Sequence, residues 1–163
     1  MLLTIDVGNT NITIGLFQDE ELVGKFRMTT KINRTADEFG FTICDLLLHK
    51  KFTPEDVDGV IIASVVPDVM HFLVSGIENY LGIKPLVVSA GVKTGIRVVT
   101  ENPKEIGADR IVDAVGARAL ADGPLIVVDF GTASTYDLIG PEGTFEAGIT
   151  APGNETAAQS LWG

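Results

Sequence analysis

Two short segments of the chain end an apolar run at an aspartate and continue with one residue, a glycine and small polar residues. The first is TIDVGNT at 4–10, and the second is VVDFGTA at 127–133. Glycine permits a positive φ and lets a ligand approach the backbone closely. Neighbouring hydroxyl and amide groups can donate to an anion, and a carboxylate can hold a Mg²⁺ ion that bridges to phosphate. We therefore predict that the two turns together bind the phosphates of a nucleotide triphosphate.

Either turn alone is a weak indication, because Asp-x-Gly after a strand occurs in many structural turns. Two copies, each opening a three-stranded meander, favour phosphate binding. The sequence contains neither GxxxxGK[ST] nor GxGxxG after a strand. His49 and His71 lack metal-ligand spacing with any acidic cluster, so we predict no transition-metal site.

The residues around the first turn predict the elements that position it. TADE at 35–38 is a capping box, in which Thr35 and Glu38 cap the start of a helix. The near-continuous apolar run VDGVIIASVV is typical of a strand buried on both faces. The expected elements are strands at 2–7, 11–17 and 21–28, a helix from 35 to about 49–51, a strand at 57–66 ended by Pro67, a helix at 68–81 and a short buried strand at 85–89.

The same order begins again in the second half of the chain. Residues 90–100 are expected to form loop and extended chain, and residues 104–122 a helix. Three further strands are expected at 125–129, 134–139 and 144–150, followed by the start of a helix after 154. Leu161 and Trp162 would have little to pack against there, so we expect a chain truncated at its C-terminus.

Composition limits the classes of partner. Of the 163 residues, 45% are apolar and 21% are charged, which is the balance of a globular protein. The formal net charge of -10 argues against binding to nucleic acid or to an anionic membrane. A phosphorylated ligand is still compatible, because backbone N–H groups and cations can hold one. The single cysteine, Cys44, favours a cytoplasmic protein, and we expect neither a targeting segment nor a membrane span.

Four motifs together resemble those of type III pantothenate kinase, a family of the acetate kinase, sugar kinase, Hsp70 and actin superfamily. They are DVGNTNI at 6–12, NPKEIGADR at 102–110, DFGTAST at 129–135 and APG at 151–153. The resemblance implies an α/β fold with two ribonuclease H-like lobes of the actin-like ATPase type. We expect the first lobe, including a substrate insert, at 1–120 and the start of an incomplete second lobe at 121–163.

The resemblance also implies an activity, the ATP-dependent phosphorylation of pantothenate to 4'-phosphopantothenate, the first step of coenzyme A biosynthesis. Asp109 would be the catalytic base, and the Arg110 guanidinium could pair with the pantothenate carboxylate. Asp129 would hold a monovalent cation, K⁺ or NH₄⁺, and Asp6 would hold Mg²⁺ through water. The implied ATP-binding residues are Asp6, Val7, Gly8, Asn9, Thr10, Asn11, Ile12, Thr13 and Thr132, and the implied pantothenate-binding residues are Gly107, Ala108, Asp109 and Arg110.

The resemblance implies in addition a homodimer of the full-length protein. One departure from the family pattern is Ala147-Gly148, where Gly-Gly is expected, so the closest backbone approach there would be altered. Two alternatives stay open. The protein could be another small-molecule kinase or an exopolyphosphatase-like hydrolase of the same superfamily, or a regulatory protein similar to Bvg accessory factor. A regulator would not need Asp109.

Overall fold

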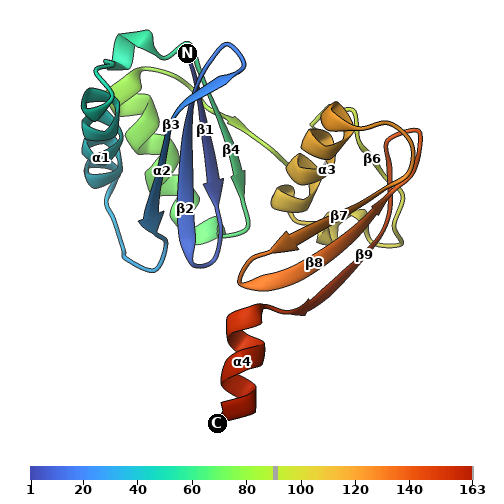
Figure 1. Ribbon diagram of the computed structural model, residues 1–163. Helices are drawn as coiled ribbons and strands as arrows, with labels where there is room; N and C mark the ends of the chain where they lie inside the picture. Colours follow the sequence, from blue (N-terminus) through green and yellow to red (C-terminus); the bar gives the residue numbers. More distant parts are fainter. Residues whose placement is uncertain (90–91, 163) are drawn as a thin grey trace. The chain divides into compact units, whose positions relative to one another are not determined.

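The computed structural model describes residues 1–89 and 92–162, which form two compact units (Figure 1). The first unit is Met1–Val88 and the second is Ser89–Gly163. Residues 89–120, which the sequence interpretation groups with the first lobe, therefore lie in the second compact unit. Among the helices in the described ranges, none has the length and apolar character that crossing a bilayer requires.

The first unit is a mixed five-stranded sheet with two helices. Strands β1 and β2 are antiparallel, β2 and β3 are antiparallel, and β1 and β4 are parallel. Apolar residues of β1, β2 and β4 share one buried cluster with residues of the helices α1 and α2. The sheet order is β3-β2-β1-β4-β5, and the bounds are β1 Leu2–Val7, β2 Asn11–Gln18, β3 Glu21–Thr29, α1 Ala36–His49, η1 Pro54–Asp56, β4 Gly59–Ser64, α2 Pro67–Leu81 and β5 Leu86–Val87.

The predicted meander and capping box are confirmed. Thr35 is the N-cap of α1, its hydroxyl accepts from the backbone N–H of Glu38, and the Glu38 carboxylate accepts from the Thr35 N–H at 2.7 Å. The sequence predicts that Pro67 ends a strand, and the structure shows that it also begins helix α2. It occupies the first turn of α2, where a missing N–H costs nothing and the fixed φ suits a helix.

Helices α1 and α2 cross at two glycines. A Cβ atom on Gly76 would lie 2.5 Å from the Ala36 carbonyl oxygen and 3.1 Å from the Gly40 nitrogen. A Cβ atom on Gly40 would overlap the ring of Tyr80. The two backbones therefore approach more closely than helices carrying larger side chains at these positions could.

The second unit is a four-stranded sheet with the order β6-β9-β8-β7. Strands β7, β8 and β9 form the second antiparallel meander, and α3 contacts β7 and β8. The cluster of Ala114, Ile139 and Phe145 is buried between α3 and this sheet. The bounds are β6 Arg97–Val98, η2 Pro103–Glu105, α3 Ala108–Leu120, β7 Leu125–Phe130, β8 Ala133–Ile139, β9 Thr144–Pro152 and α4 Asn154–Trp162.

Several predicted elements need correction. The strand predicted at 57–66 is shorter, because Val57 is the C-cap of the 3-10 turn Pro54–Asp56 and Val66 is the N-cap of α2. The strand predicted at 85–89 as buried has only two residues, and Leu86 and Val87 are 53% and 36% exposed. It lies at the edge of the sheet, where one side has no strand neighbour among the described residues.

The prediction for 90–100 as loop and extended chain falls partly on residues 90 and 91, which lie outside the described residues. Within the described part, Arg97 and Val98 form β6, which pairs in parallel with β9. The helix predicted from residue 104 begins only at Ala108, because Pro103–Glu105 forms a separate 3-10 turn.

One face of the second sheet is exposed and apolar. The register places Ile126 opposite Leu138, and Tyr136 opposite both Val128 and Ile149, so these side chains share a face. Ile126 and Ile149 are 72% and 66% exposed. On α4, Leu161 and Trp162 are also exposed, as the sequence leads us to expect. Exposed apolar patches of this kind usually mark a contact surface.

Candidate functional site

The first acidic turn is a hairpin between β1 and β2. The Gly8 N–H donates to the Asn11 carbonyl at 3.0 Å. The loop after β3 supports this turn, because the Thr30 hydroxyl donates to the Gly8 carbonyl at 2.7 Å and the Thr30 N–H donates to the Thr10 carbonyl at 2.9 Å. Thr30 is 6% exposed. A buried residue just after β3 thus fixes the backbone of the predicted phosphate turn.

Residues 6–13, predicted as one ATP-binding segment, divide between two faces. Val7 and Ile12 are fully buried in the core, so only their backbone groups could meet a ligand. Asp6 is exposed and lies directly opposite Thr13 in the hairpin register. The structure therefore brings a carboxylate and a hydroxyl together on the face away from the core.

The second turn repeats this arrangement between β7 and β8. Asp129 lies opposite Thr135, and the Gly131 N–H donates to the Ala133 carbonyl at 3.1 Å. In both hairpins the aspartate precedes the glycine by two residues and has a threonine as its cross-strand neighbour. The second turn is one residue shorter than the first. Phe130 pairs with Ser134, four positions further on, whereas Val7 pairs with Ile12, five positions further on.

The glycines of these turns contribute space for the backbone and have no unusual φ. Neither Gly8 nor Gly131 has a positive φ. What they provide is space: a Cβ atom would lie 3.2 Å from the Asn11 oxygen at Gly8, and 3.3 Å from Asp129 Oδ2 at Gly131. The close approach of a ligand to the backbone remains compatible with the structure, and neither glycine uses the positive φ that its type permits.

The APG motif lies against the second turn. A Cβ atom on Gly153 would lie 2.6 Å from the Gly131 carbonyl oxygen and would overlap the Thr132 carbonyl. Only glycine allows the end of β9 to pack so closely there. This motif therefore has a structural role in shaping the turn that contains Asp129 and Thr132.

The GADR segment opens helix α3. Gly107 is the N-cap in an extended conformation, Ala108 is buried, and Asp109 lies in the first turn, a position that favours negative charge. Asp109 Oδ1 accepts from the Arg110 backbone N–H at 2.8 Å. This contact fixes the orientation of the carboxylate that is the candidate base.

Arg110 has a partner that the sequence interpretation missed. Its Nε donates to Asp137 Oδ1 at 2.9 Å and to Oδ2 at 3.1 Å, and its Nη2 also donates to Asp137. Nη1 lies 3.3 Å from Thr150 Oγ1, and the guanidinium carbon lies 5.7 Å from the centre of the Phe145 ring. The signal available in the sequence is weak: a charged residue stands at an inward-facing position of an alternating strand, TYDLI.

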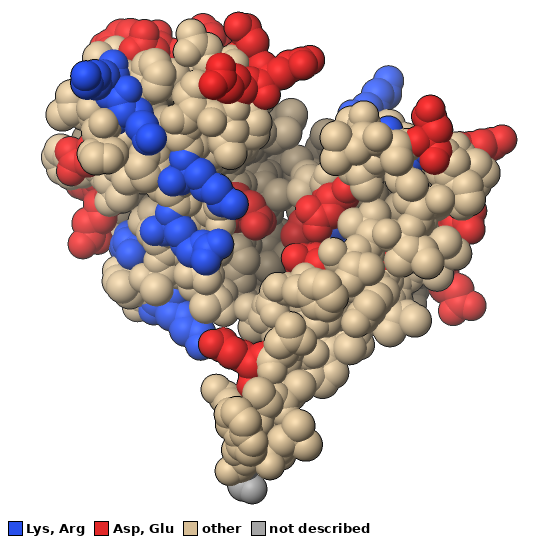
Figure 2. Space-filling view, viewed as in Figure 1, with Lys and Arg blue, Asp and Glu red and all other residues tan. Residues whose placement is uncertain are grey.

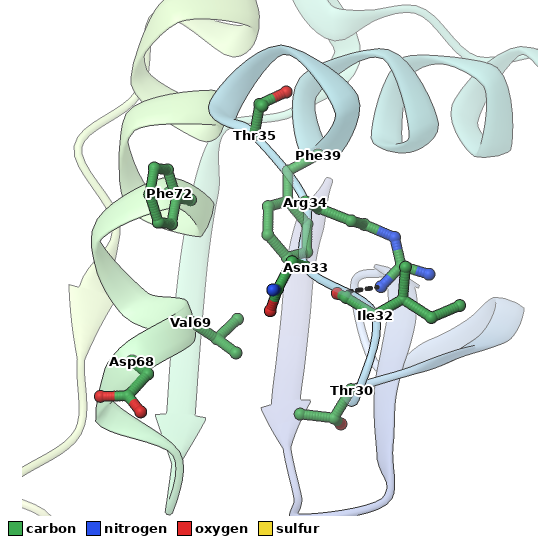
Figure 3. Close-up of a pocket in the computed structure, with 9 residues that line it drawn as sticks. All are labelled: Thr30, Ile32, Asn33, Arg34, Thr35, Phe39, Asp68, Val69 and Phe72. Atoms are coloured by element: carbon green, nitrogen blue, oxygen red, sulfur yellow. Dashed lines mark hydrogen bonds between the residues drawn. The ribbon is translucent and has the colours of Figure 1, made fainter.

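A pocket of about 420 Å³ lies beside the first turn, between α2 and the segment that leads into α1 (Figure 3). Thr30 belongs both to this pocket and to the support of the turn. Arg34 Nη1 donates to the Thr29 carbonyl at 2.7 Å, and its guanidinium lies 5.9 Å from the Phe39 ring centre. The pocket is lined by Thr30, Ile32, Asn33, Arg34, Thr35, Phe39, Asp68, Val69 and Phe72.

Charged side chains are distributed unevenly over the face shown in Figure 2. In the view of Figure 2, Asp and Glu side chains are exposed on both units, while Lys and Arg gather over the first. With a net charge of -10, an anionic ligand is better held by local donors such as backbone N–H groups than by a general surface potential.

The acids of the described ranges do not form a metal site by themselves. No group of three or more His, Cys, Asp or Glu residues in these ranges could hold an ion. Asp6 could serve a Mg²⁺ site of the type in which one carboxylate, water molecules and substrate phosphates bind the ion. Asp129 has Thr135 across the hairpin, so a carboxylate and a hydroxyl oxygen are available there to a cation.

The two meanders with their acidic turns define the actin-like ATPase class of fold, and solved structures agree. The chain is similar to the Aquifex aeolicus Ppx/GppA phosphatase, type II variant (TM-score 0.54, 15% identity, covering 98% of this chain and 54% of that one). It is also similar to the ethanolamine utilization protein EutJ from Carboxydothermus hydrogenoformans (TM-score 0.50, 14% identity, covering 98% and 54%).

Sequence comparison gives the family. The sequence model of type III pantothenate kinase matches residues 2–163, and the chain belongs to this family. It is 52% identical to the type III pantothenate kinase of Agathobacter rectalis and 45% identical to that of Listeria welshimeri, over 162 residues in each case. These alignments cover 99% of this chain and 62% of each relative, so the chain spans less than two thirds of their length.

Proposed function

We propose that the protein containing this chain phosphorylates pantothenate to 4'-phosphopantothenate with ATP, and that this chain supplies the phosphate turns and the catalytic base. One observation supports this proposal above the others. Two hairpins with the same Asp-Thr pair beside a glycine occur in a chain that belongs to the type III pantothenate kinase family. The fold alone, which a phosphatase shares, would leave the reaction open.

The roles of the turns follow from their donors. Residues 6–13 would bind ATP mainly through backbone N–H groups and the exposed side chains, with Thr132 contributing from the second turn. Mg²⁺, held through water by Asp6, would neutralise charge on the transferred phosphoryl group when it is bound. Asp129 would hold K⁺ or NH₄⁺ with the help of the Thr135 hydroxyl, its cross-strand neighbour.

Asp109 would accept the proton of the pantothenate hydroxyl. Phosphoryl transfer needs positioning and charge stabilisation more than covalent help, so a fixed carboxylate near the attacking hydroxyl is suited to this role. The hydrogen bond from the Arg110 backbone N–H holds Asp109 in place. Residues 107–110 would bind pantothenate.

The proposal includes three properties of the full-length protein. We expect a cytoplasmic enzyme, because the sequence has a single cysteine. We expect a homodimer, and the exposed apolar face of β7, β8 and β9 would suit a contact surface. We expect no nucleic acid or membrane among its partners, in line with the acidic net charge.

The test is a coupled ADP-release assay with and without pantothenate, in Mg²⁺ with either K⁺ or Na⁺. Three proteins are compared: the chain itself, the Asp109→Asn variant and the Asp122→Asn variant. Asp122 is an exposed acid just beyond the C-terminal end of α3, so it is a matched control for removing one charge. We expect pantothenate-dependent, K⁺-stimulated turnover that is lost in Asp109→Asn and kept in Asp122→Asn.

Other outcomes would change the assignment. Turnover that does not depend on pantothenate would refute the substrate and favour another superfamily activity. Equal turnover in Asp109→Asn would refute the role of the base. If the chain releases no ADP, the same comparison is made in the full-length protein.

A further inference from the structure

The Arg110 guanidinium is held in one orientation by a buried carboxylate. Asp137 is 2% exposed and contacts Nε and Nη2 side-on, which is the strong bidentate geometry of an arginine-carboxylate pair. A buried carboxylate needs such a partner, because an unpaired charge is costly in the interior. Helix α3 and strand β8 are therefore joined at the residue that follows the candidate base.

The surroundings of this pair are built to admit the guanidinium. A Cβ atom on Gly148 would lie 2.9 Å from the Arg110 guanidinium carbon and 2.8 Å from Asp137 Oδ1, so only glycine leaves room here. Phe145, which is fully buried, presents its ring to the cation. The position at which the family pattern departs is Ala147, and the glycine that this contact requires is retained.

At the other end of the guanidinium, two N–H groups have no hydrogen-bond partner among the described residues. Contacts with Asp137 and Thr150 use Nε, one N–H of Nη2 and one of Nη1, out of five N–H groups. The Arg110 side chain is 14% exposed, and Thr150 is exposed on β9. Because Thr150 Oγ1 accepts from Arg110, its own O–H can donate in the same direction.

We propose that Asp137 is a positioning residue that holds Arg110 so that its outer N–H groups and the Thr150 hydroxyl together bind the carboxylate of pantothenate. This inference rests on the proposed function and adds to it two residues, Asp137 and Thr150. The paired charge of Arg110 is already balanced by Asp137, so selectivity for a carboxylate depends on directed hydrogen bonds. A ligand with an uncharged hydroxyl in place of the carboxylate would accept fewer hydrogen bonds from Arg110 and Thr150.

The test follows the Arg110 Nε–Hε resonance by NMR while the chain is titrated with pantothenate or with its alcohol analogue, in which CH₂OH replaces the carboxylate. We expect a slowly exchanging Arg110 Nε–H, shifted by pantothenate and not by the alcohol. Asp137→Asn should weaken pantothenate binding about 10-fold or more and accelerate exchange of this N–H. ATP binding should change much less than pantothenate binding.

A second variant keeps the test valid if Asp137→Asn unfolds. Thr150→Val alters an exposed side chain of nearly the same shape, and it should reduce the preference for pantothenate over the alcohol without changing exchange of the Arg110 Nε–H. Asp122→Asn is the control for both variants. A merely structural role for Asp137 would weaken both ligands equally.

The proposal is overturned if the two ligands bind equally to the unmodified chain, if neither binds, or if both variants keep its preference. It is also overturned if the Arg110 Nε–H exchanges rapidly in the unmodified chain. Failure of the kinase function is a separate result, because it appears as pantothenate-independent turnover in the ADP-release assay.

Discussion

Replacing Gly153 by alanine should distort the second acidic turn, because Gly153 packs against its backbone. The added Cβ would lie 2.6 Å from the Gly131 carbonyl oxygen, and such contacts below 3.0 Å essentially never occur. The carbonyl must therefore retreat by at least about 0.4 Å, a minimum set by the carbon-oxygen distance. Because the obstacle is backbone, no side-chain rotation can relieve it.

The expected cost follows from comparable core substitutions. Overpacking of this kind costs about 1–3 kcal/mol, and each kcal/mol lowers Tm by about 4–8 °C in a domain of 60–100 residues. The second unit, Ser89–Gly163, falls in this size range. We therefore expect its unfolding temperature to fall by at least about 4 °C, while the first unit is unchanged.

The assay is thermal unfolding combined with hydrogen exchange resolved to peptides, which separates the two units. Gly116→Ala is the matched control, because a Cβ at Gly116 in α3 would meet nothing within 4 Å. It should stabilise the second unit by about 0.5–1 kcal/mol through helix propensity. Faster exchange in Gly153→Ala should centre on residues 129–133, and ATP binding should weaken as the turn moves.

The reasoning would be refuted if Gly153→Ala left the second unit as stable as Gly116→Ala does. It would also be refuted if the destabilisation appeared in the first unit, or if exchange at the second turn stayed slow.

Three further predictions concern the first unit. Gly76→Ala should destabilise it by about 1–3 kcal/mol in chemical denaturation, despite the better helix propensity of alanine, because the Cβ would crowd α1. The capping bond from the Thr35 backbone N–H lowers the pKa of Glu38. The stability that ionised Glu38 contributes is therefore present at neutral pH and is lost as pH falls through the lowered pKa. Glu38→Gln should lower Tm at pH 7 and have little effect in acid. Burial raises the pKa of Cys44, so iodoacetamide should alkylate it more slowly than free cysteine at pH 8.

Each of these predictions has a control or an opposing outcome. An increase in stability with Gly76→Ala would show that the helices separate freely. A loss of stability in Glu38→Gln that does not depend on pH would contradict the capping account. Alkylation of Cys44 as fast as free cysteine would show that its thiol is not buried in solution.

The parts of the fold that depend on local sequence could be predicted. The meanders, the α1 capping box and both acidic turns are encoded by alternation and by residues within three or four positions of each other. Strand β6 could not be predicted, because two residues show no periodicity and its pairing with β9 joins Arg97 to Thr144. The exposure of β5 likewise depends on which strands surround it, and not on its own sequence.

The same distinction applies to the candidate site. Asp6, Asp129 and Asp109 could be proposed from motifs, because each stands in a recognisable turn or helix start. Asp137 could not, because its contact with Arg110 spans 27 positions and requires both the register of β8 and the packing of α3. A resemblance between sequences indicates which residues meet a ligand, but the residues that hold them in place emerge from tertiary contacts.

The two units carry the same hairpin in different surroundings. In the first unit β1 lies between β2 and β4, so the strand that bears Asp6 is paired on both sides. In the second unit β7 bears Asp129 and pairs only with β8 among the strands of the described ranges. The cluster around Ile139 and Phe145 is small beside that of the first unit. The ion pair of Arg110 with Asp137 joins α3 to β8 within this second unit, so breaking it should disturb the Asp109 end of α3 and leave the acidic turn of the first unit unchanged.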